Sequence, residues 1–379
     1  MLKKNKKKIL VFINNRYLPE HNGAAVFFHN TAKKLIKKFN VKVVRICSKS
    51  KFKKTYKKDG IEILSLSIPD ILFKYQITSI IYFFFNLFFK LIFKRFNFNV
   101  VHCITITWHT LICIFLVKFF NKNTKVIIDH TLFTDLQIYP NLKSKFLFQL
   151  KKYILSKADI IRSPSPFLSK QLKKIGIKNY EIFLPNINLK KFTIPTKKNK
   201  LKLRSKLKIN KKKFVILSVG RVSLRKGSDI LIKAFKKINQ NNKFKLILLG
   251  PCDPSFKKYK SENDVFIPDI KVENVNEYMK ASDLFVLLSR NEGLGIVFFE
   301  ALACGLRIIL PKIPGVSDFI LGKKKNIGLE TSYQVNDIEK KIMFFYKNKK
   351  KRYQFKCRAR VNQLINSPKI IFNLNKNWN

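Results

Sequence analysis

Acidic side chains are scarce in this chain of 379 residues, where 22 Asp and Glu stand against 78 Lys and Arg and give a net charge of +56. Glycine (12), proline (13) and tryptophan (2) are also few. So large a positive charge is typical of proteins that bind nucleic acid or anionic membranes. Here the lysines are spread along the whole chain, and Lys, Asn, Ile and Phe are abundant together, as a coding sequence rich in A and T would produce. We therefore favour compositional drift over a dedicated polyanion site.

No pair of cysteines has the C-x-x-C spacing, and no aspartate-rich metal motif is evident. Most of the six cysteines lie within apolar runs, which is typical of buried thiols in a reducing compartment rather than of disulfides or zinc ligands. A signal peptide is not evident either, because the first apolar run, 9–13, ends at a polar segment after five residues. We therefore expect a cytoplasmic protein that binds no metal ion.

The sequence also lacks an uninterrupted apolar run that clearly spans a membrane. Residues 77–93 reach about the minimum length, but Asn86 and Lys90 interrupt them, and Lys94 and Arg95 follow. We predict that this run forms a buried or interfacial helix. Together with the basic excess, it suggests peripheral contact with an anionic membrane at its inner face.

What the chain does have is a regular alternation of strand-like and helix-length segments, in two series. The expected strands of the first series are 8–13, 41–46, 100–102, 125–128 and 160–161, and those of the second are 214–219, 245–249, 265–267, 284–288 and 307–310. This rhythm is typical of a parallel, doubly wound sheet. The predicted fold class is therefore α/β, with two Rossmann-like domains that face each other across a ligand-binding cleft.

A change in composition sets the expected domain boundary. Residues 195–212 are polar and rich in lysine, and we interpret them as an interdomain connection with a short helix. The prediction is an N-terminal, acceptor-binding domain over 1–195 and a second, donor-binding domain over 196–345. A tail over 346–379, helical to about Gln363, is expected to pack back toward the N-terminal domain.

A basic loop follows the first strand of the second series, with the sequence Gly220-Arg221-Val222-Ser223-Leu224-Arg225-Lys226-Gly227. Arg221 and Lys226 can converge on a diphosphate, the arginine as a forked donor and the lysine as a point charge. In a chain with 78 Lys and Arg, a basic loop alone is more often a solvated surface. The two glycines that bracket this loop favour a ligand site. It is not a Walker A loop, because G-x-x-x-x-G-K-[ST] is absent.

The most informative stretch is 290–305, directly after the expected strand 284–288. Seven residues separate Glu292 from Glu300, and Gly293 and Gly295 free the backbone before an apolar, helix-like segment. A glycine turn that opens a helix presents bare N–H groups and the positive end of the helix dipole to an anion. The carboxylates can accept hydrogen bonds from sugar hydroxyls. The stretch therefore predicts a nucleotide-sugar site.

These motifs together resemble those of the retaining glycosyltransferases of family 4 (glycosyl transferases group 1), which have the two-domain GT-B fold. Residues 17–25 resemble the family's glycine loop facing the donor phosphates, 220–227 its diphosphate clamp and 292–300 its E-x7-E signature. The resemblance covers nearly the whole chain. It implies transfer of a hexose-type sugar from a nucleotide-diphosphate donor to a glycan or lipid-linked acceptor, with retention at the anomeric carbon and without a cofactor or divalent ion.

The same resemblance implies a role for each site residue. Arg221 and Lys226 bind the diphosphate and stabilise its charge as it leaves. Glu292 orients the transferred sugar, Glu300 holds the ribose hydroxyls, and His130 is the catalytic histidine of the first domain. The other donor-binding residues are Gly23, Ala24, Gly220, Gly293, Leu294, Gly295 and Ile296. Without the resemblance, His130 is more simply explained as a buried structural histidine.

Several questions stay open at this point. Pro268-Asp269 stands where the family commonly has a glycine near the base, so the base is undetermined, as are the sugar and the acceptor. The alternatives to an active enzyme are an inactive homologue of the same fold and a basic protein that binds membranes or nucleic acid. The sequence shows no aromatic–basic module of the kind that binds nucleic acid, so no specific nucleic acid is expected. A phosphorylase or an epimerase on this scaffold would need a cofactor lysine or a different carboxylate arrangement.

Overall fold

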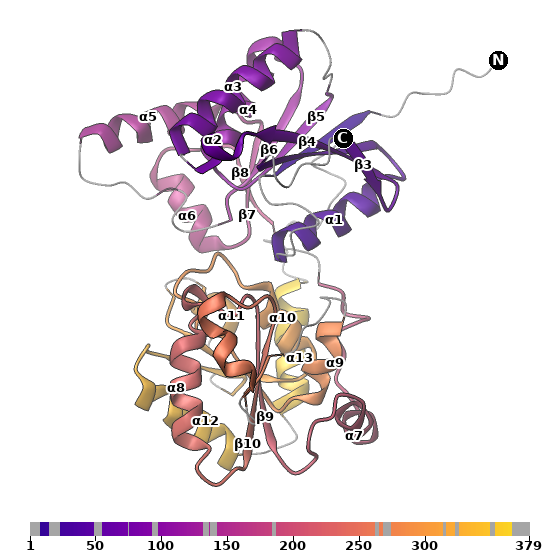
Figure 1. The fold of residues 1–379 in the computed structure, drawn as a ribbon, viewed down its shortest axis with the longest axis vertical. Coiled ribbons are helices and arrows are strands. Elements are labelled where there is room, and N and C mark those ends of the chain that lie inside the picture. The colour runs from indigo at the N-terminus through magenta and orange to yellow at the C-terminus, as the bar shows by residue number, and fades with distance from the viewer. Residues whose placement is uncertain are drawn as a thin grey trace, which may run out of the picture. The chain divides into compact units, whose positions relative to one another are not determined.

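The computed structural model describes residues 8–14, 23–48, 55–74, 76–92, 98–131, 136, 142–183, 187–261, 265–267, 274–313, 316–322, 326–348 and 353–365. The chain forms two compact units, each with its own sheet and helices (Figure 1). Unit 1 covers Met1–Phe183 and unit 2 covers Leu184–Ile370. Each unit is described by itself below.

The sheet of unit 1 is parallel except at one edge, where β3 and β4 are antiparallel. In spatial order its strands are β3 (Thr55–Lys58), β4 (Ile61–Ile68), β2 (Asn40–Ser48), β1 (Ile9–Asn14), β5 (Val100–Ile104), β6 (Lys125–Asp129), β7 (Ile160–Ser163) and β8 (Tyr180–Ile182). Residues of β5 are buried throughout, because helices cover both faces of such a sheet. All the strands expected in the first series are present. The edge strands β3 and β8 and the inner strand β4 were not expected.

Helices cover the two faces of the unit 1 sheet in separate layers (Figure 1). One face is covered by α1 (Gly23–Leu35), whose Phe28, Ala32 and Leu35 pack on the strands. The other face carries α3 (Gln76–Ile92), α4 (Trp108–Phe120) and α5 (Leu142–Ser156), with the short α2 (Asp70–Lys74) beside α3. The sixth helix, α6 (Pro166–Lys174), joins β7 to β8.

The expected interfacial or buried helix at 77–93 corresponds to α3. Its Phe83 and Leu87 are buried in the core, while Ile81 and Phe85 on the other side of the helix are half exposed. None of the helices in the described residues has the length and apolar character that crossing a bilayer requires.

The sheet of unit 2 is wholly parallel. In spatial order its strands are β11 (Val265–Phe266), β10 (Phe244–Leu249), β9 (Phe214–Val219), β12 (Leu284–Val286), β13 (Arg307–Pro311) and β14 (Gly328–Thr331). Every residue of β9 is buried, which explains its continuous apolar run in the sequence. The strands expected in the second series are present, and β14 is additional.

Unit 2 also has helices on both faces of its sheet (Figure 1). Its helices are α7 (Lys197–Lys206), α8 (Ser228–Ile238), α9 (Val275–Ala281), α10 (Ile296–Ala303), α11 (Ser317–Leu321), α12 (Val335–Lys347) and α13 (Tyr353–Ile365). Side chains of α8 and α12 share one core cluster with β9 and β10. The short helix expected within 195–212 is α7, which Thr196 caps by accepting a hydrogen bond from the Asn199 amide at 3.2 Å.

The boundary between the units lies earlier than the sequence suggested, at Phe183/Leu184 instead of 195/196. Arg358 of α13 shows why the intervening residues belong to unit 2. Its guanidinium donates to the carbonyls of Phe192 at 2.6 Å, Leu189 at 3.2 Å and Ala303 at 2.9 Å. The described part of the tail, α13, thus packs within unit 2, and residues 366–379 lie outside the described residues.

A buried charge cluster joins three neighbouring strands of unit 1. Arg162 on β7 donates to both carboxylate oxygens of Asp129 on β6, at 2.8 and 3.0 Å, and His102 on β5 lies 3.0 Å from the same carboxylate. Burial by itself raises the pKa of Asp129, but Arg162 and His102 outweigh it and hold that pKa well below its ordinary value. Burial lowers the pKa of His102, which keeps its ring neutral at pH 7.

The Asp129→Asn variant should lose about 3–5 kcal/mol of folding free energy, because it leaves the Arg162 cation buried without its counter-charge. In the wild type, both pKa shifts make the folded state bind fewer protons than the unfolded state. Stability should therefore decline as the pH falls below about 6.5 and again below about 4, which urea unfolding at several pH values measures. Asp59→Asn is the control, since Asp59 is 43% exposed and its φ of 50° suits asparagine. Similar losses in both variants would contradict the proposed importance of burial.

Two loops of unit 2 approach each other closely at Gly227. This glycine has a φ of 69°, and a Cβ atom built on it would lie 2.1 Å from the Leu288 carbonyl oxygen. Only glycine fits here, both because the conformation is left-handed and because the backbone after β12 occupies the space. Gly227 thus fixes the distance between the loop after β9 and the loop after β12.

Gly227→Ala should destabilise the protein by several kcal/mol, whereas Gly60→Ala should cost only about 1–2 kcal/mol. Gly60 has a similar φ of 76°, but the nearest atom to its Cβ position is 3.8 Å away. Comparison of the two variants therefore separates the cost of backbone strain from that of steric collision, and the urea unfolding midpoint of each variant measures its stability. Equal midpoints for the two variants would show that the loops can separate without cost.

Candidate active site

The strand order of unit 2 reverses between β9 and β12. From β9 the chain moves outward through β10 and β11, and it then returns to β12 on the other side of β9. The two strands are parallel neighbours, with Leu284 opposite Ile216. Connections that leave such strands toward opposite sides open a crevice at the carboxyl edge, which is where doubly wound sheets bind ligands. The two motif loops, 220–227 and 287–295, leave β9 and β12 at this position.

An ion pair between Lys226 and Glu292 joins the two loops. The Lys226 Nζ donates to Oε1 of Glu292, and Ser289 Oγ donates to the same oxygen at 2.9 Å. The Lys226 chain passes over Gly220, with Cε 3.5 Å from the position of a Cβ there. Glu292 is only 9% exposed. The lysine expected to bind diphosphate and the glutamate expected to orient the sugar are therefore in contact.

Two arginines hold the loops in place. Arg290 donates to both carboxylate oxygens of Asp229, at 2.9 and 2.8 Å, and its amide donates to the Arg225 carbonyl at 2.9 Å. Arg225 in turn reaches the Asn291 carbonyl at 3.4 Å. Arg290 is thus committed to the protein itself. The sequence assigned Lys226 and Arg221 of these loops to a ligand, and Arg225 is a further exposed cation there.

Arg221 has a different partner from Lys226. Its Nη1 donates to Asp253, which follows β10, at 3.1 Å, and its side chain is 50% exposed. The structure therefore does not bring Arg221 to the same point as Lys226, in contrast to the expected convergence of the two. An exposed ion pair of this kind contributes about 0–1 kcal/mol, so a phosphate can displace Asp253 at little cost.

The second motif opens α10 as the sequence suggested. Gly295, with a φ of 71°, is the N-cap residue, and a glycine has no side chain with which to cap the first amides of the helix. These amides and the helix dipole suit an anionic oxygen. Gly293 and Leu294 lie in the turn before Gly295, and Ile296 begins the helix. Leu294 is 4% exposed, so its side chain fills the core and only its backbone can serve a ligand.

Glu300 lies one turn into α10 and is partly buried. Burial raises the pKa of its carboxyl to about 7, although the positive charge of Lys191 opposes the shift. A carboxyl in this environment gains from any hydrogen-bond donor that reaches it. Hydroxyl groups of a ligand can be such donors.

The remaining candidates belong to unit 1. Gly23 and Ala24 form the start of α1, which follows β1, and residues 17–22 of the expected phosphate loop lie outside the described residues. His130 directly follows β6 and is fully buried, and its amide donates to the Arg162 carbonyl at 2.8 Å. His130 thus lies at the carboxyl end of a strand, the edge where a doubly wound sheet binds ligands.

Sequence reasoning missed several residues that shape the site in unit 2. Ser289 shares the Glu292 carboxylate with Lys226, and the Tyr333 hydroxyl donates to the Ser289 carbonyl at 2.8 Å. Asp253 pairs with Arg221, and Asp229 pairs with Arg290. The role of Ser289 could have been predicted from the sequence, because this residue precedes Glu292 by only three positions. The sequence gives no indication of the role of Tyr333, because this residue follows β14, the edge strand of the sheet.

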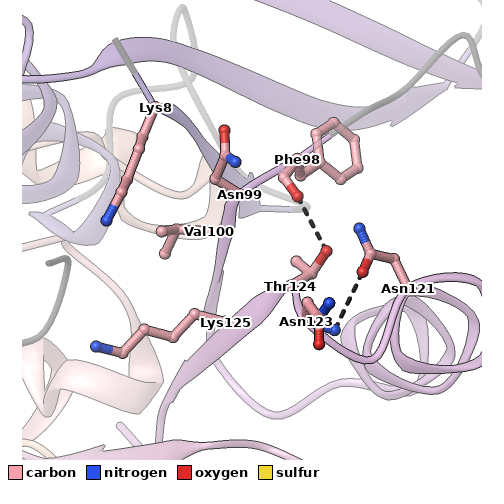
Figure 2. A pocket seen from close by; sticks show the side chains of 8 residues that line it. All are labelled: Lys8, Phe98, Asn99, Val100, Asn121, Asn123, Thr124 and Lys125. Carbon is pink, nitrogen blue, oxygen red and sulfur yellow. Dashed lines mark hydrogen bonds between the residues drawn. The ribbon is translucent and has the colours of Figure 1, made fainter. Parts of the chain in front are cut away.

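Two other features of the described residues bear on ligands. No group of three or more His, Cys, Asp or Glu side chains among them is placed to hold a metal ion. A cavity of about 300 Å³ opens at the amino edge of the unit 1 sheet, and the side chains of Lys8 and Lys125 extend along the same side of it (Figure 2). The residues that line it are Lys8, Phe98, Asn99, Val100, Asn121, Asn123, Thr124 and Lys125. None of them is among the predicted site residues.

Comparison with known proteins covers both units. The family model "Glycosyltransferase Family 4" matches residues 21–184, and "Glycosyl transferases group 1" matches residues 199–362. Alpha-monoglucosyldiacylglycerol synthase of Streptococcus pneumoniae is 27% identical over 221 residues, which are 53% of this chain and 50% of that protein. The chain thus spans about half the length of the curated relatives that it matches first.

Solved structures resemble the chain over nearly its full length. Sucrose-phosphate synthase from Thermosynechococcus elongatus aligns with a TM-score of 0.72 and 18% identity, over 95% of each chain. Anabaena Alr3699/HepE in complex with UDP and glucose aligns with a TM-score of 0.70 and 15% identity, over 97% of this chain and 96% of that one. At sequence identities of 15% and 18%, the structural similarity establishes the fold alone. Taken with the two family models, it establishes that the chain is a GT-B glycosyltransferase of family 4.

Proposed function

We propose that this glycosyltransferase moves a hexose-type sugar from a nucleotide-diphosphate donor to a glycan or lipid-linked acceptor, with retention at the anomeric carbon and without a metal ion. The observation that carries the proposal is the Lys226–Glu292 pair at the strand-order reversal of unit 2. Structures solved with UDP and UDP-glucose among the similar folds support a nucleotide-sugar donor. The name of the Streptococcus pneumoniae relative supports an acceptor attached to lipid.

The pair suggests how the donor binds. Without a donor, Glu292 supplies the counter-charge of Lys226; a diphosphate takes over this role when it binds. Lys226 then stabilises the charge that develops on the leaving diphosphate. Arg221 can exchange its exposed pair with Asp253 for the same phosphates. The amides at the start of α10 add donors that are already oriented.

Glu292 is suited to hold sugar hydroxyls while the lysine is engaged. Both hydrogen bonds to its carboxylate within the described residues go to Oε1. Oε2 can therefore accept from a hydroxyl without disturbing Ser289. Gly23, Ala24, Gly220, Gly293, Leu294, Gly295 and Ile296 complete the donor site in this proposal. His130 is the catalytic histidine of the first domain in this proposal, and the donor phosphate takes the proton of the attacking hydroxyl, so no enzyme nucleophile is needed.

Two other assignments remain as competitors. An inactive homologue of the same fold could bind the nucleotide without turnover, and hydrolysis of the donor by the purified protein separates it from an enzyme. A basic protein that binds nucleic acid would instead show RNA or DNA affinity that falls steeply with salt. Retention has its own test, because an NMR spectrum that shows an inverted product excludes it.

Lys226→Ala should weaken nucleotide binding by about 10–100-fold, the equivalent of one charged hydrogen bond of about 1.5–3 kcal/mol. A thermal-shift series with UDP, GDP, ADP and their sugars identifies the base, and the variant should lose the shift that the preferred nucleotide gives. Lys233→Ala is the matched control, since Lys233 is an exposed lysine on α8. A nucleotide shift that Lys226→Ala retains in full would remove Lys226 from the site.

Donor binding should release a proton near pH 6.5 if Glu300 holds the ribose. The hydroxyls donate to the ionised carboxylate and so lower its pKa below the value of about 7 that burial gives it. Calorimetry with the intact nucleotide sugar in buffers of different ionisation enthalpy measures the release. It should vanish in Glu300→Gln and, for the wild type, at pH 9, where the carboxyl is already ionised. Equal release from wild type and Glu300→Gln would assign the proton to another group.

A further inference from the structure

The exposed apolar side chains of unit 1 are confined to one helical layer. Every large hydrophobic side chain that is exposed in the described part of this unit lies on α2, α3, α4 or α5. The set is Ile71, Ile77, Ile81, Phe85, Phe115, Phe119, Phe120, Phe146, Leu147, Leu150 and Tyr153. In unit 2 such residues are scattered over several helices and loops. A concentration of this kind marks an interaction surface.

Helical spacing places these side chains in rows. On α3, Ile77, Ile81 and Phe85 recur at every fourth residue, and on α4 Phe115 and Phe119 do the same. The three residues of α3 are 70%, 52% and 51% exposed. Residues three or four apart share one side of a helix, so each row lies along the outer side.

The exposed rows do not contribute to the hydrophobic core of unit 1. The opposite sides of α3 and α4 already supply Phe83, Leu87, Leu111 and Ile114 to the core cluster, each 3% exposed or less. These helices are therefore apolar on both sides. In a water-soluble domain a helix that is apolar all round is expected only where its outer side is also covered.

The rows of neighbouring helices adjoin one another. Phe88 of α3 and Phe120 of α4 lie 5.6 Å apart between ring centroids, and Phe119 lies 5.3 Å from Phe120. Lys151 of α5 lies over the ring of Trp108 of α4 at 6.0 Å. Figure 1 shows α3, α4 and α5 together on one face of the unit 1 sheet. Contacts thus join α3 to α4 and α4 to α5, and we call the outer sides of these three helices together the outer face of α3–α5.

The charge of this face selects its partner. The sequences of α3, α4 and α5 contain no Asp or Glu, and they contain Lys90, Lys118, Lys143, Lys145, Lys151 and Lys152. Lys118 is paired with Asp159 at 2.7 Å, and the short α2 adds Asp70, so the basic excess comes from the other five lysines. Lysines beside aromatic and aliphatic side chains suit the boundary between anionic headgroups and acyl chains. A second copy of this chain is a poor partner, because two proteins with a net charge of +56 repel each other.

We propose that the outer face of α3–α5 docks on a bilayer that contains anionic lipid, with Phe85, Phe119 and Phe146 entering the headgroup boundary. The helices lie in the plane of the interface and do not cross it. This deepens the lipid-linked acceptor of the proposed function by naming the surface that meets the membrane. Docking itself requires neither donor nor turnover, so the two proposals fail separately.

Co-sedimentation of the full chain with vesicles tests the docking surface. Wild type should bind vesicles of phosphatidylcholine with phosphatidylglycerol at least about tenfold more tightly than vesicles of phosphatidylcholine alone. The double variant Phe119→Ser, Phe146→Ser should lose at least about tenfold of that binding. Both side chains are about 70% exposed, so the fold should survive, and an unchanged urea unfolding midpoint verifies that it does.

The matched control is Phe344→Ser, Phe355→Ser, which removes phenylalanines that are 51% and 71% exposed in unit 2. This control should bind vesicles as the wild type does. Three results would each overturn the proposal: equal binding of wild type to neutral and anionic vesicles, an equal loss in the control variant, or conversion of a wild-type dimer to a monomer by the double variant. The last result would identify the face as a contact between copies.

Discussion

The ion pair between Lys226 and Glu292 is the interaction on which the candidate site depends. It joins two loops that are far apart in the sequence, and it can do so because β9 and β12 are neighbours where the strand order reverses. Neither charge is well hydrated, since the two side chains are only 15% and 10% exposed. A buried charge needs a partner, so an empty site holds the pair together and a bound diphosphate must compete with Glu292 for the lysine. In the proposed donor site, this ion pair couples the phosphate end of the donor to the sugar end.

The loops around the pair are held before any ligand binds. Gly227 allows the two backbones to approach closely, and Arg290 ties its own loop to Asp229 at the start of α8. Groups that are already oriented lose little entropy when a ligand arrives and need little reorganisation as charge develops. Arg221 is the contrast, because it is half exposed and paired with Asp253 outside this framework. In the proposed mechanism, Lys226 supplies the fixed part of the charge stabilisation and Arg221 the adjustable part.

The sequence predicts the fold well because buried parallel strands produce apolar runs, as in residues 214–217 and 246–249. It predicts the two site loops because their signals are local. Edge strand β3 was not predicted, because Thr55–Lys58 is largely exposed and polar and so gives no apolar run. Partners such as Tyr333 and Ser289, 44 residues apart, meet only through the topology of the sheet. The domain boundary was placed too late for the same reason, since it is Arg358, near the other end of the chain, that binds Leu189 and Phe192 to unit 2.

The excess of basic residues has two different consequences. Because acidic residues are few, several of them anchor structure: Asp129 holds Arg162, Asp283 holds Arg204 and Lys200, and Asp229 holds Arg290. The cations left over give the surface a diffuse attraction for any polyanion, which does not distinguish one partner from another. The rows on α3–α5 favour a lipid interface over nucleic acid, because they combine aliphatic side chains such as Ile77 and Ile81 with phenylalanines, whereas nucleic-acid bases stack mainly on aromatic side chains. Charge that arose through composition can thus serve a membrane surface without any lysine being specific for it.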